Sequence, residues 1–438
     1  MKKLLLVQPT TTSTLDFVNY SSSVIGSVLP LLPDSILKKN LNSKKAVNVP
    51  TLSTMILSAL TPRDQFEVEF IDEKIESINY DSNPDLVAIT SNTTIINRAY
   101  EIAGEFRKRG TKVVLGGVHA SILPEEVSQH VDAVAIGEAE YIWQDILNDF
   151  LRGNLKERYQ ADKFVDMSKD YVLPDNSILK RDFYLTDTSI ELSRGCPHKC
   201  TFCSDSVVYG SKYRVRDIDQ VIAQIEQTES DYLFFADDNV IGKPKFAKEL
   251  LGRLAKKDKR WIGSASTILA ENKELTDLVI ESGCKFLIVG FESTSPESLM
   301  QIGKKQNLKK DYGDFVRYLQ DNGVVVASCF ILGFENDSVQ SIREQHQYAQ
   351  DQGMLFYMPG VLTPYPGTPL FDGFKESDRL LHQDWSKYNV RGGIPVFSGR
   401  NHTDEYLKEL ASTVKTNGVH YFLKQLQNHP ELIEKFIN

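Results

Sequence analysis

The chain has 438 residues, of which 41% are hydrophobic and 25% are charged, a composition typical of a soluble globular protein with more than one domain. Its formal net charge of −9 argues against a general nucleic-acid-binding surface. Only five cysteines are present, which indicates a protein of the reducing cytoplasm and not a disulfide framework. No apolar run approaches the length that a bilayer span requires.

Strands and helices are predicted to alternate through the first 151 residues. Apolar runs predict strands at residues 2–7, 66–70, 85–90, 112–115 and 133–136, and helical spacing predicts helices at 49–60, 96–109 and 141–151. This alternation is typical of a Rossmann-like, doubly wound parallel sheet. Residues 10–49 are rich in Ser, Thr and Asn, and we expect them to form a long flap over the next domain.

Polar or glycine-rich turns follow three of these strands. They comprise Ser91, Asn92 and Thr93, then Gly116, Gly117, Val118 and His119, and finally Gly137 and Glu138. Such turns line the ligand crevice at the carboxyl edge of an open parallel sheet. Glycines there allow close approach of a large flat ligand, so we expect a bulky side chain at Gly117 to block binding.

A second series of alternating elements follows residues 152–187, which carry charges and few periodic apolar positions and therefore read as a linker. Strands are predicted at 232–236, 261–265, 286–290, 324–332 and 355–362, with helices at 218–227, 246–256, 274–282, 312–322 and 339–352. With a strand at 189–195, this series has six strands. Residues 371–438, including an amphipathic helix at 404–422, form a helical carboxyl-terminal region.

Three cysteines with C-x3-C-x2-C spacing, Cys196, Cys200 and Cys203, follow the first strand of this second series. They lie where α/β folds place their chemistry, on a loop at the carboxyl end of a strand. Three thiolates can hold a 4Fe-4S cluster through three of its irons, so the fourth iron stays open. The alternative is a structural zinc site, but such sites usually have four ligands, and no second cysteine pair follows nearby.

The cysteine spacing, with the aromatic Phe202 before the last cysteine, resembles the radical S-adenosylmethionine (SAM) superfamily. This resemblance implies a partial (β/α)6 barrel at residues 188–370. It also implies that the cluster binds SAM and cleaves it to methionine and a 5'-deoxyadenosyl radical. Residues at successive strand ends would then contact SAM: Phe202, Asp237, Asp238, Ser266, Glu292, Ser293 and Tyr365.

The first 151 residues resemble the cobalamin-binding domain that often precedes a radical SAM core. The three turns described above would contact cobalamin, although the D-x-H-x-x-G motif that supplies a cobalt ligand in some such domains is absent. Radical family members generally lack that histidine too and hold cobalamin with its lower ligand detached. A lone histidine in a turn, such as His119, is more often a hydrogen-bonding residue than a metal ligand. The alternative is a scaffold that binds nothing.

Together, these resemblances imply a cobalamin-dependent radical SAM methyltransferase that acts on an unactivated carbon. We expect a cytoplasmic enzyme with a small-molecule, lipid or peptide substrate and an external electron donor such as flavodoxin or ferredoxin. The sequence identifies no general acid or base. Two alternatives remain: cobalamin-linked radical cyclisation or rearrangement without methyl transfer, and a non-catalytic cobalamin- or metal-dependent sensor.

Overall fold

The computed structural model describes residues 1–10, 50–184, 186, 188–308, 311–418, 421–422 and 424–425. Except for Thr10, the flap expected at residues 10–49 therefore lies outside the described residues. The described chain forms two compact units, and the main division between them falls between Ser189 and Ile190. The short segment Val207–Tyr209 also belongs to the first unit.

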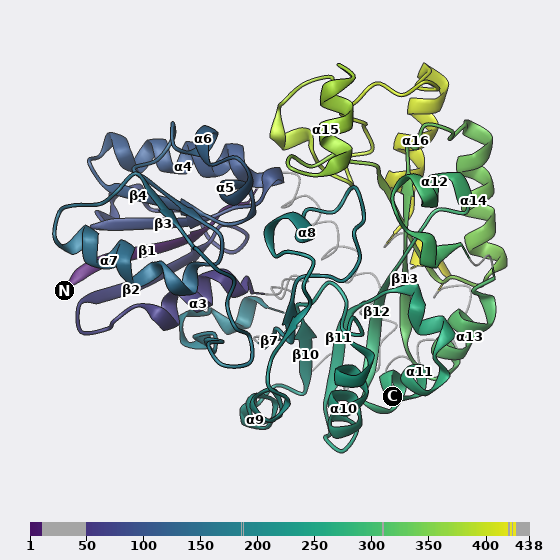
Figure 1. Cartoon of the computed structure of the whole chain (residues 1–438), viewed down its shortest axis with the longest axis horizontal. Coiled ribbons are helices and arrows are strands. Elements are labelled where there is room, and N and C mark those ends of the chain that lie inside the picture. The colour runs from purple at the N-terminus through teal and green to yellow at the C-terminus, as the bar shows by residue number, and fades with distance from the viewer. Residues whose placement is uncertain are drawn as a thin grey trace. The chain divides into compact units, whose positions relative to one another are not determined.

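The first unit is built on a six-stranded parallel sheet with the order β2-β1-β3-β4-β5-β6. Its strands are β1 (Lys2–Gln8), β2 (Phe66–Asp72), β3 (Leu86–Thr90), β4 (Lys112–Gly116), β5 (Ala133–Ile136) and β6 (Arg158–Gln160). Its helices are α3 (Leu52–Leu60), α4 (Ile96–Lys108), α5 (Val118–Ile122), α6 (Pro124–Val127) and α7 (Trp143–Leu151). Figure 1 shows α4, α5 and α6 on one face of the sheet and α3 and α7 on the other, which confirms the doubly wound prediction.

Strand β6 lies in the segment that the sequence presents as a linker. It pairs with β5, and its Tyr159 is buried in the same hydrophobic cluster as Trp143. Tyr184, further along this segment, packs into that cluster and donates a hydrogen bond to Asp72 at 3.1 Å. Residues 152–187 thus include part of the first unit. Sequence periodicity indicates this poorly because β6 has only three residues.

The second unit is built on a six-stranded sheet with the order β14-β13-β12-β11-β10-β7. The strands are β7 (Ser189–Ile190), β10 (Tyr232–Phe235), β11 (Arg260–Ala265), β12 (Cys284–Glu292), β13 (Val325–Leu332) and β14 (Phe356–Val361). The helices between them are α9 (Ile218–Gln227), α10 (Pro244–Leu254), α11 (Lys273–Glu281), α12 (Pro296–Gln301), α13 (Gly313–Asp321) and α14 (Val339–Asp351). Strands β10 to β14 are parallel, and Figure 1 shows α10, α11, α13 and α14 along the outer side of the sheet. This is the open β/α series that the sequence predicts.

The two faces of this second sheet differ in burial. Along β11, half-buried and buried residues alternate, and the buried Trp261 belongs to the core formed with the helices. Leu287 and Val289 of β12 also belong to that core, whereas Ile288 and Gly290 between them are half-buried. Because successive side chains point to opposite faces of a strand, the half-buried set belongs to the inner face. That inner face is therefore less covered by protein than the outer face.

The carboxyl-terminal region adds α15 (Pro369–Glu376) and α16 (Asp404–Thr416) to the second unit. The helix expected at 404–422 is therefore shorter, since α16 ends at Thr416 and the chain turns at Gly418, which has a positive φ of 78°. Within the described part of the chain, no helix has the length and apolarity needed to cross a membrane.

Candidate functional site

The cysteine loop leaves the second sheet through a turn at Gly195, whose φ of +82° suits a residue without a side chain. Cys200 is buried, while Cys196 and Cys203 are half-buried. Thr201, between the last two cysteines, donates its backbone N–H to Ile302 at 3.1 Å and accepts from Leu370 N–H at 3.0 Å. The loop is therefore fixed from outside by the end of α12 and the start of α15.

All three thiols lie in surroundings that favour their protonated form when no ligand is bound. Burial raises the pKa of Cys196, Cys200 and Cys203 above the ordinary value for a thiol. The positive charge of Lys304 lowers the pKa of Cys196 and Cys200 and so opposes part of this rise. Among the described residues, no three His, Cys, Asp or Glu side chains are grouped closely enough to hold a single metal ion.

Lys304 forms an ion pair with Glu292 that sequence reasoning missed. Its Nζ lies 2.9 Å from Glu292 Oε1, and the two side chains are only 12% and 9% exposed. Burial acts to lower the pKa of Lys304, but Glu292 and the nearby thiols raise it overall, so this amine stays charged. A cation thus lies between the cysteine loop and the end of β12.

The backbone at the end of β12 is shaped to hold this ion pair. Glu292 has a φ of +69°, which is uncommon for a residue with a side chain, and the pairing register with β13 shifts between Gly290 and Glu292. A Cβ on Gly290 would collide with Glu292 Oε1 and lie 3.4 Å from Lys304 Nζ. The Gly-Phe-Glu-Ser sequence therefore makes room for a buried carboxylate that carries its own counter-ion.

Asp237 is predicted to contact SAM, and in the structure its carboxylate accepts hydrogen bonds from other residues of the protein. It accepts hydrogen bonds from the backbone N–H of Leu192 at 2.8 Å and from the hydroxyl of Ser193. Burial raises the pKa of Asp237 to about 7. This side chain thus connects the end of β10 to the segment leading into the cysteine loop.

The Asp238 side chain is exposed, whereas that of Asp237 is buried. Dense surrounding protein and the carboxylate of Asp205 nevertheless raise the pKa of Asp238 to about 8. Asp205 also lies 3.3 Å from the thiol of Cys203. Two acidic groups therefore lie beside the cysteine loop, where they could receive a cationic group of a ligand.

A buried hydroxyl without a hydrogen-bond partner in the described part of the chain lies at the end of β11. Ser266 is buried, and its Oγ has no hydrogen-bond partner among the described residues, whereas its backbone N–H donates to Asn239 Oδ1 at 3.2 Å. A buried hydroxyl without a partner is costly and uncommon. This orphaned hydroxyl fits the predicted contact of Ser266 with a bound ligand.

The remaining residues predicted to contact SAM pack against or hydrogen-bond to other residues of the protein. Phe202 packs against a hydrophobic cluster that contains Ile302 and Phe334. Ser293 Oγ accepts from Ser295 N–H at 3.1 Å, and the carbonyl of Tyr365 accepts from the Thr368 hydroxyl at 2.6 Å. All three lie at loop or strand ends near the carboxyl edge of the second sheet, and their contact with SAM stays a prediction.

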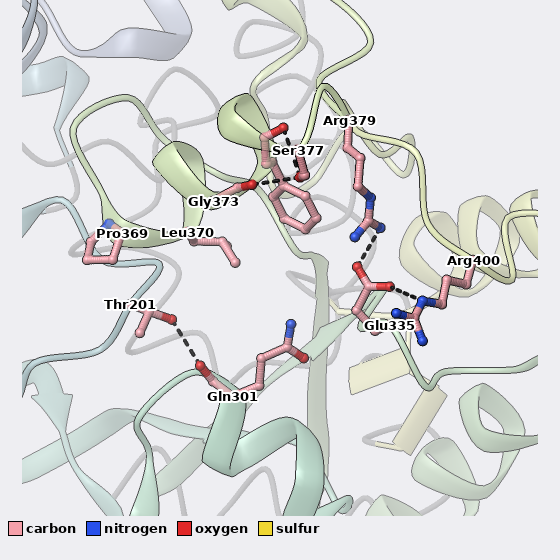
Figure 2. Close-up of a pocket in the computed structure, with 10 residues that line it drawn as sticks. Thr201, Gln301, Glu335, Pro369, Leu370, Gly373, Ser377, Arg379 and Arg400 are labelled. Carbon is pink, nitrogen blue, oxygen red and sulfur yellow. Dashed lines mark hydrogen bonds and ion pairs between the residues drawn. The ribbon is translucent and has the colours of Figure 1, made fainter.

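A surface pocket of about 460 Å³ opens on the outer side of the cysteine loop (Figure 2). Thr201 and Gln301 line one side of it, and residues of α15 line the other. Arg379 and Arg400 approach the single carboxylate of Glu335 at 2.5 Å and 3.8 Å, and Figure 2 shows both arginines at the end of the pocket away from Thr201. The pocket therefore has more positive than negative charge at its far end from Thr201 of the cysteine loop.

In the first unit, the structure brings the three predicted turns together. Strands β3, β4 and β5 are neighbours in the sheet, so the turns after Thr90, Gly116 and Ile136 lie along one edge. Asn92 is exposed, and Gly116, Gly117, Val118 and Gly137 are half-buried. Ser91 and Thr93 are buried, as is Glu138, whose carboxylate accepts from Val165 N–H at 2.5 Å.

Two residues of this edge have structural roles that the sequence does not reveal. A Cβ on Gly117, whose φ is +100°, would lie 2.5 Å from the carbonyl oxygen of Ser91, so the missing side chain lets the two turns pack together. A bulky residue at Gly117 would therefore also disturb the packing of the two turns, and its expected effect on ligand binding stays a prediction. His119 is fully buried and lies 3.1 Å from Thr93 Oγ1, which agrees with a hydrogen-bonding role.

Comparisons with known proteins agree with both halves of this description. Residues 190–348 match the radical SAM superfamily, and residues 41–147 match the B12 binding domain. The chain is 33% identical over 357 residues to bacteriochlorophyllide d C-12(1)-methyltransferase of Chlorobaculum tepidum, covering 79% of this chain and 77% of that protein. It is 32% identical over 354 residues to bacteriochlorophyllide d C-8(2)-methyltransferase of the same organism, covering 76% and 78%.

A solved structure shares this fold. The radical SAM methyltransferase TsrM from Kitasatospora setae, solved with tryptophan substrate and a SAM analogue, aligns with a TM-score of 0.64 at 17% identity. The alignment covers 86% of this chain and 76% of that one. The alignment shows that this chain shares the fold of that protein over most of its length.

Proposed function

Since this chain belongs to the family of cobalamin-dependent radical SAM methyltransferases, we propose that it transfers a methyl group to an unactivated carbon of a small-molecule substrate. The observation that carries this proposal is the 33% identity to a methyltransferase, which extends over 79% of the chain. When bound, the cluster supplies an electron to SAM, and cobalamin carries the methyl group. We expect the enzyme to work in the cytoplasm.

The donor set of the second unit fits the cluster. We assign Cys196, Cys200 and Cys203 as its three ligands because they share one loop, and the remaining cysteines, Cys284 and Cys329, lie on strands β12 and β13. Lys304 is the cation that offsets part of the negative charge of the thiolates. This buried cation favours an anionic group at the loop.

The residues at the strand ends fit SAM. The orphaned hydroxyl of Ser266 can donate to or accept from a polar group of this ligand. Asp238 and Asp205 can receive its positively charged groups, since SAM carries an ammonium and a sulfonium. Binding of that positive charge would lower the pKa of Asp238 and favour its ionised form.

The edge of the first sheet fits a large flat ligand such as cobalamin. It presents small, accessible residues at Gly116, Val118 and Gly137 on three neighbouring turns. His119 is occupied by Thr93 and Glu126, so we expect cobalamin to bind with its lower ligand detached and with no histidine from this turn.

An external one-electron donor such as flavodoxin or ferredoxin would reach the cluster from the outer side of the cysteine loop. The pocket in Figure 2 is lined by Thr201, which lies between two of the proposed cluster ligands. Its surplus of positive charge suits an acidic electron-transfer protein, because complementary charge accelerates association.

Product analysis under anaerobic conditions tests methyl transfer. Reconstituted enzyme with SAM, cobalamin, a reductant and the true substrate should form S-adenosylhomocysteine and 5'-deoxyadenosine in equal amounts per methylated product. A cyclase or rearrangement enzyme would form 5'-deoxyadenosine without matching S-adenosylhomocysteine, and a sensor would form neither. Either result would overturn the proposed reaction.

A further inference from the structure

The inner face of the second sheet is largely apolar toward its β12–β14 side. Val325, Ala327 and Phe356 form a buried cluster there, against which the half-buried Ile288 and Met358 pack. Phe286 also contacts this cluster, and Phe422 stacks on Phe356 with ring centroids 4.9 Å apart. An aromatic or otherwise bulky apolar ligand would match these side chains.

A tight turn presents one cation, Arg391, to this region. Asn389 Oδ1 accepts from Arg391 N–H, and the Asn389 carbonyl accepts from Gly392 N–H, both at 2.9 Å. The carbonyl of Val390 accepts from Val361 N–H at 2.7 Å, which fixes the turn to the end of β14. Arg391 therefore extends from a backbone that is held in place.

The guanidinium lies against the inner face. Its Nη1 is 3.7 Å from the position that a Cβ on Gly418 would occupy, and Phe356 Cε2 is 4.0 Å from the same position. Arg391 is also close enough to Cys329, on β13, to act on its thiol: burial raises the pKa of Cys329 to about 12, and Arg391 opposes this rise. Cys329 pairs with Met358 in the register of β13 and β14.

Arg391 has no hydrogen bond or ion pair from its side chain to any described residue. Lys304, the other cation near Cys329, is already paired with Glu292. The Arg391 side chain is exposed, yet the protein around it lowers the pKa of the guanidinium. An exposed guanidinium that no described residue binds keeps its N–H donors available for an anion.

We propose that Arg391 binds the anionic group of the substrate, so that the substrate is a bulky, apolar, ring-containing molecule with a carboxylate or a similar anion. This inference rests on the proposed function, because it places the substrate at the inner face of the radical SAM sheet. A guanidinium suits this task because it can donate two parallel hydrogen bonds to a carboxylate. The half-buried side chains Ile288 of β12 and Met358 of β14 would contact the rest of the molecule.

A matched pair of probes tests this assignment without knowledge of the substrate. 1-Pyrenebutyric acid and its methyl ester have the same apolar rings, and only the acid is charged at neutral pH. Binding of each to the anaerobically reconstituted holoenzyme is measured by fluorescence titration. We expect the acid to bind more tightly than the ester by about ten-fold or more, the usual effect of a charge-assisted hydrogen bond.

Substitutions then identify the residue responsible. Arg391→Met should abolish the preference for the acid without changing affinity for the ester, and Arg391→Lys should retain part of the preference. Arg391→Gln gives the same readout if the methionine variant does not fold. Lys256→Met removes an exposed cation elsewhere in this unit and should change neither affinity. Uncoupled formation of 5'-deoxyadenosine from SAM should survive in every variant.

Three results would overturn the assignment: equal binding of acid and ester to the unmodified enzyme, a preference that survives Arg391→Met, or no binding of either probe. These failures differ from failure of the proposed function. The binding assay involves no turnover, whereas the proposed methyl transfer fails if S-adenosylhomocysteine does not accompany 5'-deoxyadenosine.

Discussion

Cys196, Cys200 and Cys203 differ from the two remaining cysteines in their structural setting. The first three share a loop, whereas Cys284 and Cys329 lie within strands, and the Cys284 side chain belongs to the hydrophobic core. We therefore expect a protein with all three loop cysteines replaced by alanine to lose the cluster absorbance and its iron, about four atoms per chain in a single cubane. Cys284→Ala should retain both, and loss of iron in that control would contradict the assignment.

The ion pair between Lys304 and Glu292 places two opposite charges next to each other in buried surroundings. Lys304→Met should lower the free energy of unfolding of the apo-protein by about 3–5 kcal/mol, because it leaves Glu292 as an uncompensated buried charge. Urea unfolding measures the change. The double variant Lys304→Met/Glu292→Gln should recover part of the loss.

A matched control for this pair lies on the surface of the same unit. Lys248 and Glu274 are 33% and 68% exposed, so Lys248→Met should cost about 1 kcal/mol or less. If the Lys304 and Lys248 variants lost equal stability, the Lys304–Glu292 pair would not have the buried character that we assign to it.

Asp237 should make the stability of the apo-protein depend on pH. Its pKa rises from 3.8 to about 7 on folding, so the folded protein binds more protons than the unfolded chain between these values. Stability from this group is therefore full below about pH 4 and is lost as the pH rises toward 7. Asp237→Asn cannot titrate, but its amide can still accept from Leu192 and bond Ser193.

We expect the difference in unfolding free energy between the parent protein and Asp237→Asn to change steadily from pH 4 to pH 7, in the direction that favours the asparagine variant at higher pH. Urea unfolding at several pH values measures this difference. A constant difference across the range would show that Asp237 is already ionised at low pH.

At the scale of elements, the sequence predicts which residues lie at the ends of strands. It does not predict which residues from other segments pair with them. The alternation of β and α elements places Asp237, Ser266 and Glu292 at one sheet edge from their order along the chain. Lys304 lies beyond α12, and Arg391 lies in a turn without hydrophobic periodicity, so only the folded structure shows what each charge faces. Strand β6 was missed for the related reason that its three residues carry no pattern.

The glycines of the first unit illustrate the same distinction. Gly117 is required by packing between turns, whereas Gly104 lies inside helix α4, where a Cβ would have no other atom within 4 Å. Gly104→Ala should therefore stabilise the protein by about 0.5–1 kcal/mol, since alanine is the better helix former. Gly117→Ala should destabilise it, because the new Cβ meets the Ser91 backbone and φ is positive. Thermal unfolding measures both changes, and equal effects would contradict this distinction.

At the scale of the whole molecule, one chain combines two parallel sheets, each of which presents its candidate ligand-binding residues at the carboxyl ends of its strands. The edge of the first sheet is built from small residues and suits a flat cofactor. The second sheet carries thiols, buried charges and an apolar inner face, which suit a cluster, SAM and substrate. Neither sheet alone holds all the groups that the proposed methyl transfer needs.

Reduction of the cluster by a partner protein should depend on the surface outside the cysteine loop. Arg400 is 84% exposed at the pocket of Figure 2, so Arg400→Glu should slow the reduction of the cluster by flavodoxin or ferredoxin several-fold at low salt. The variant should be reduced by dithionite at the unchanged rate, because that small reductant needs no docking surface. Lys256→Glu, at an exposed position just beyond the end of α10, is the matched charge reversal and should change neither rate. Equal rates for the Arg400 variant and the unmodified enzyme with the protein donor would place the docking surface elsewhere on the molecule.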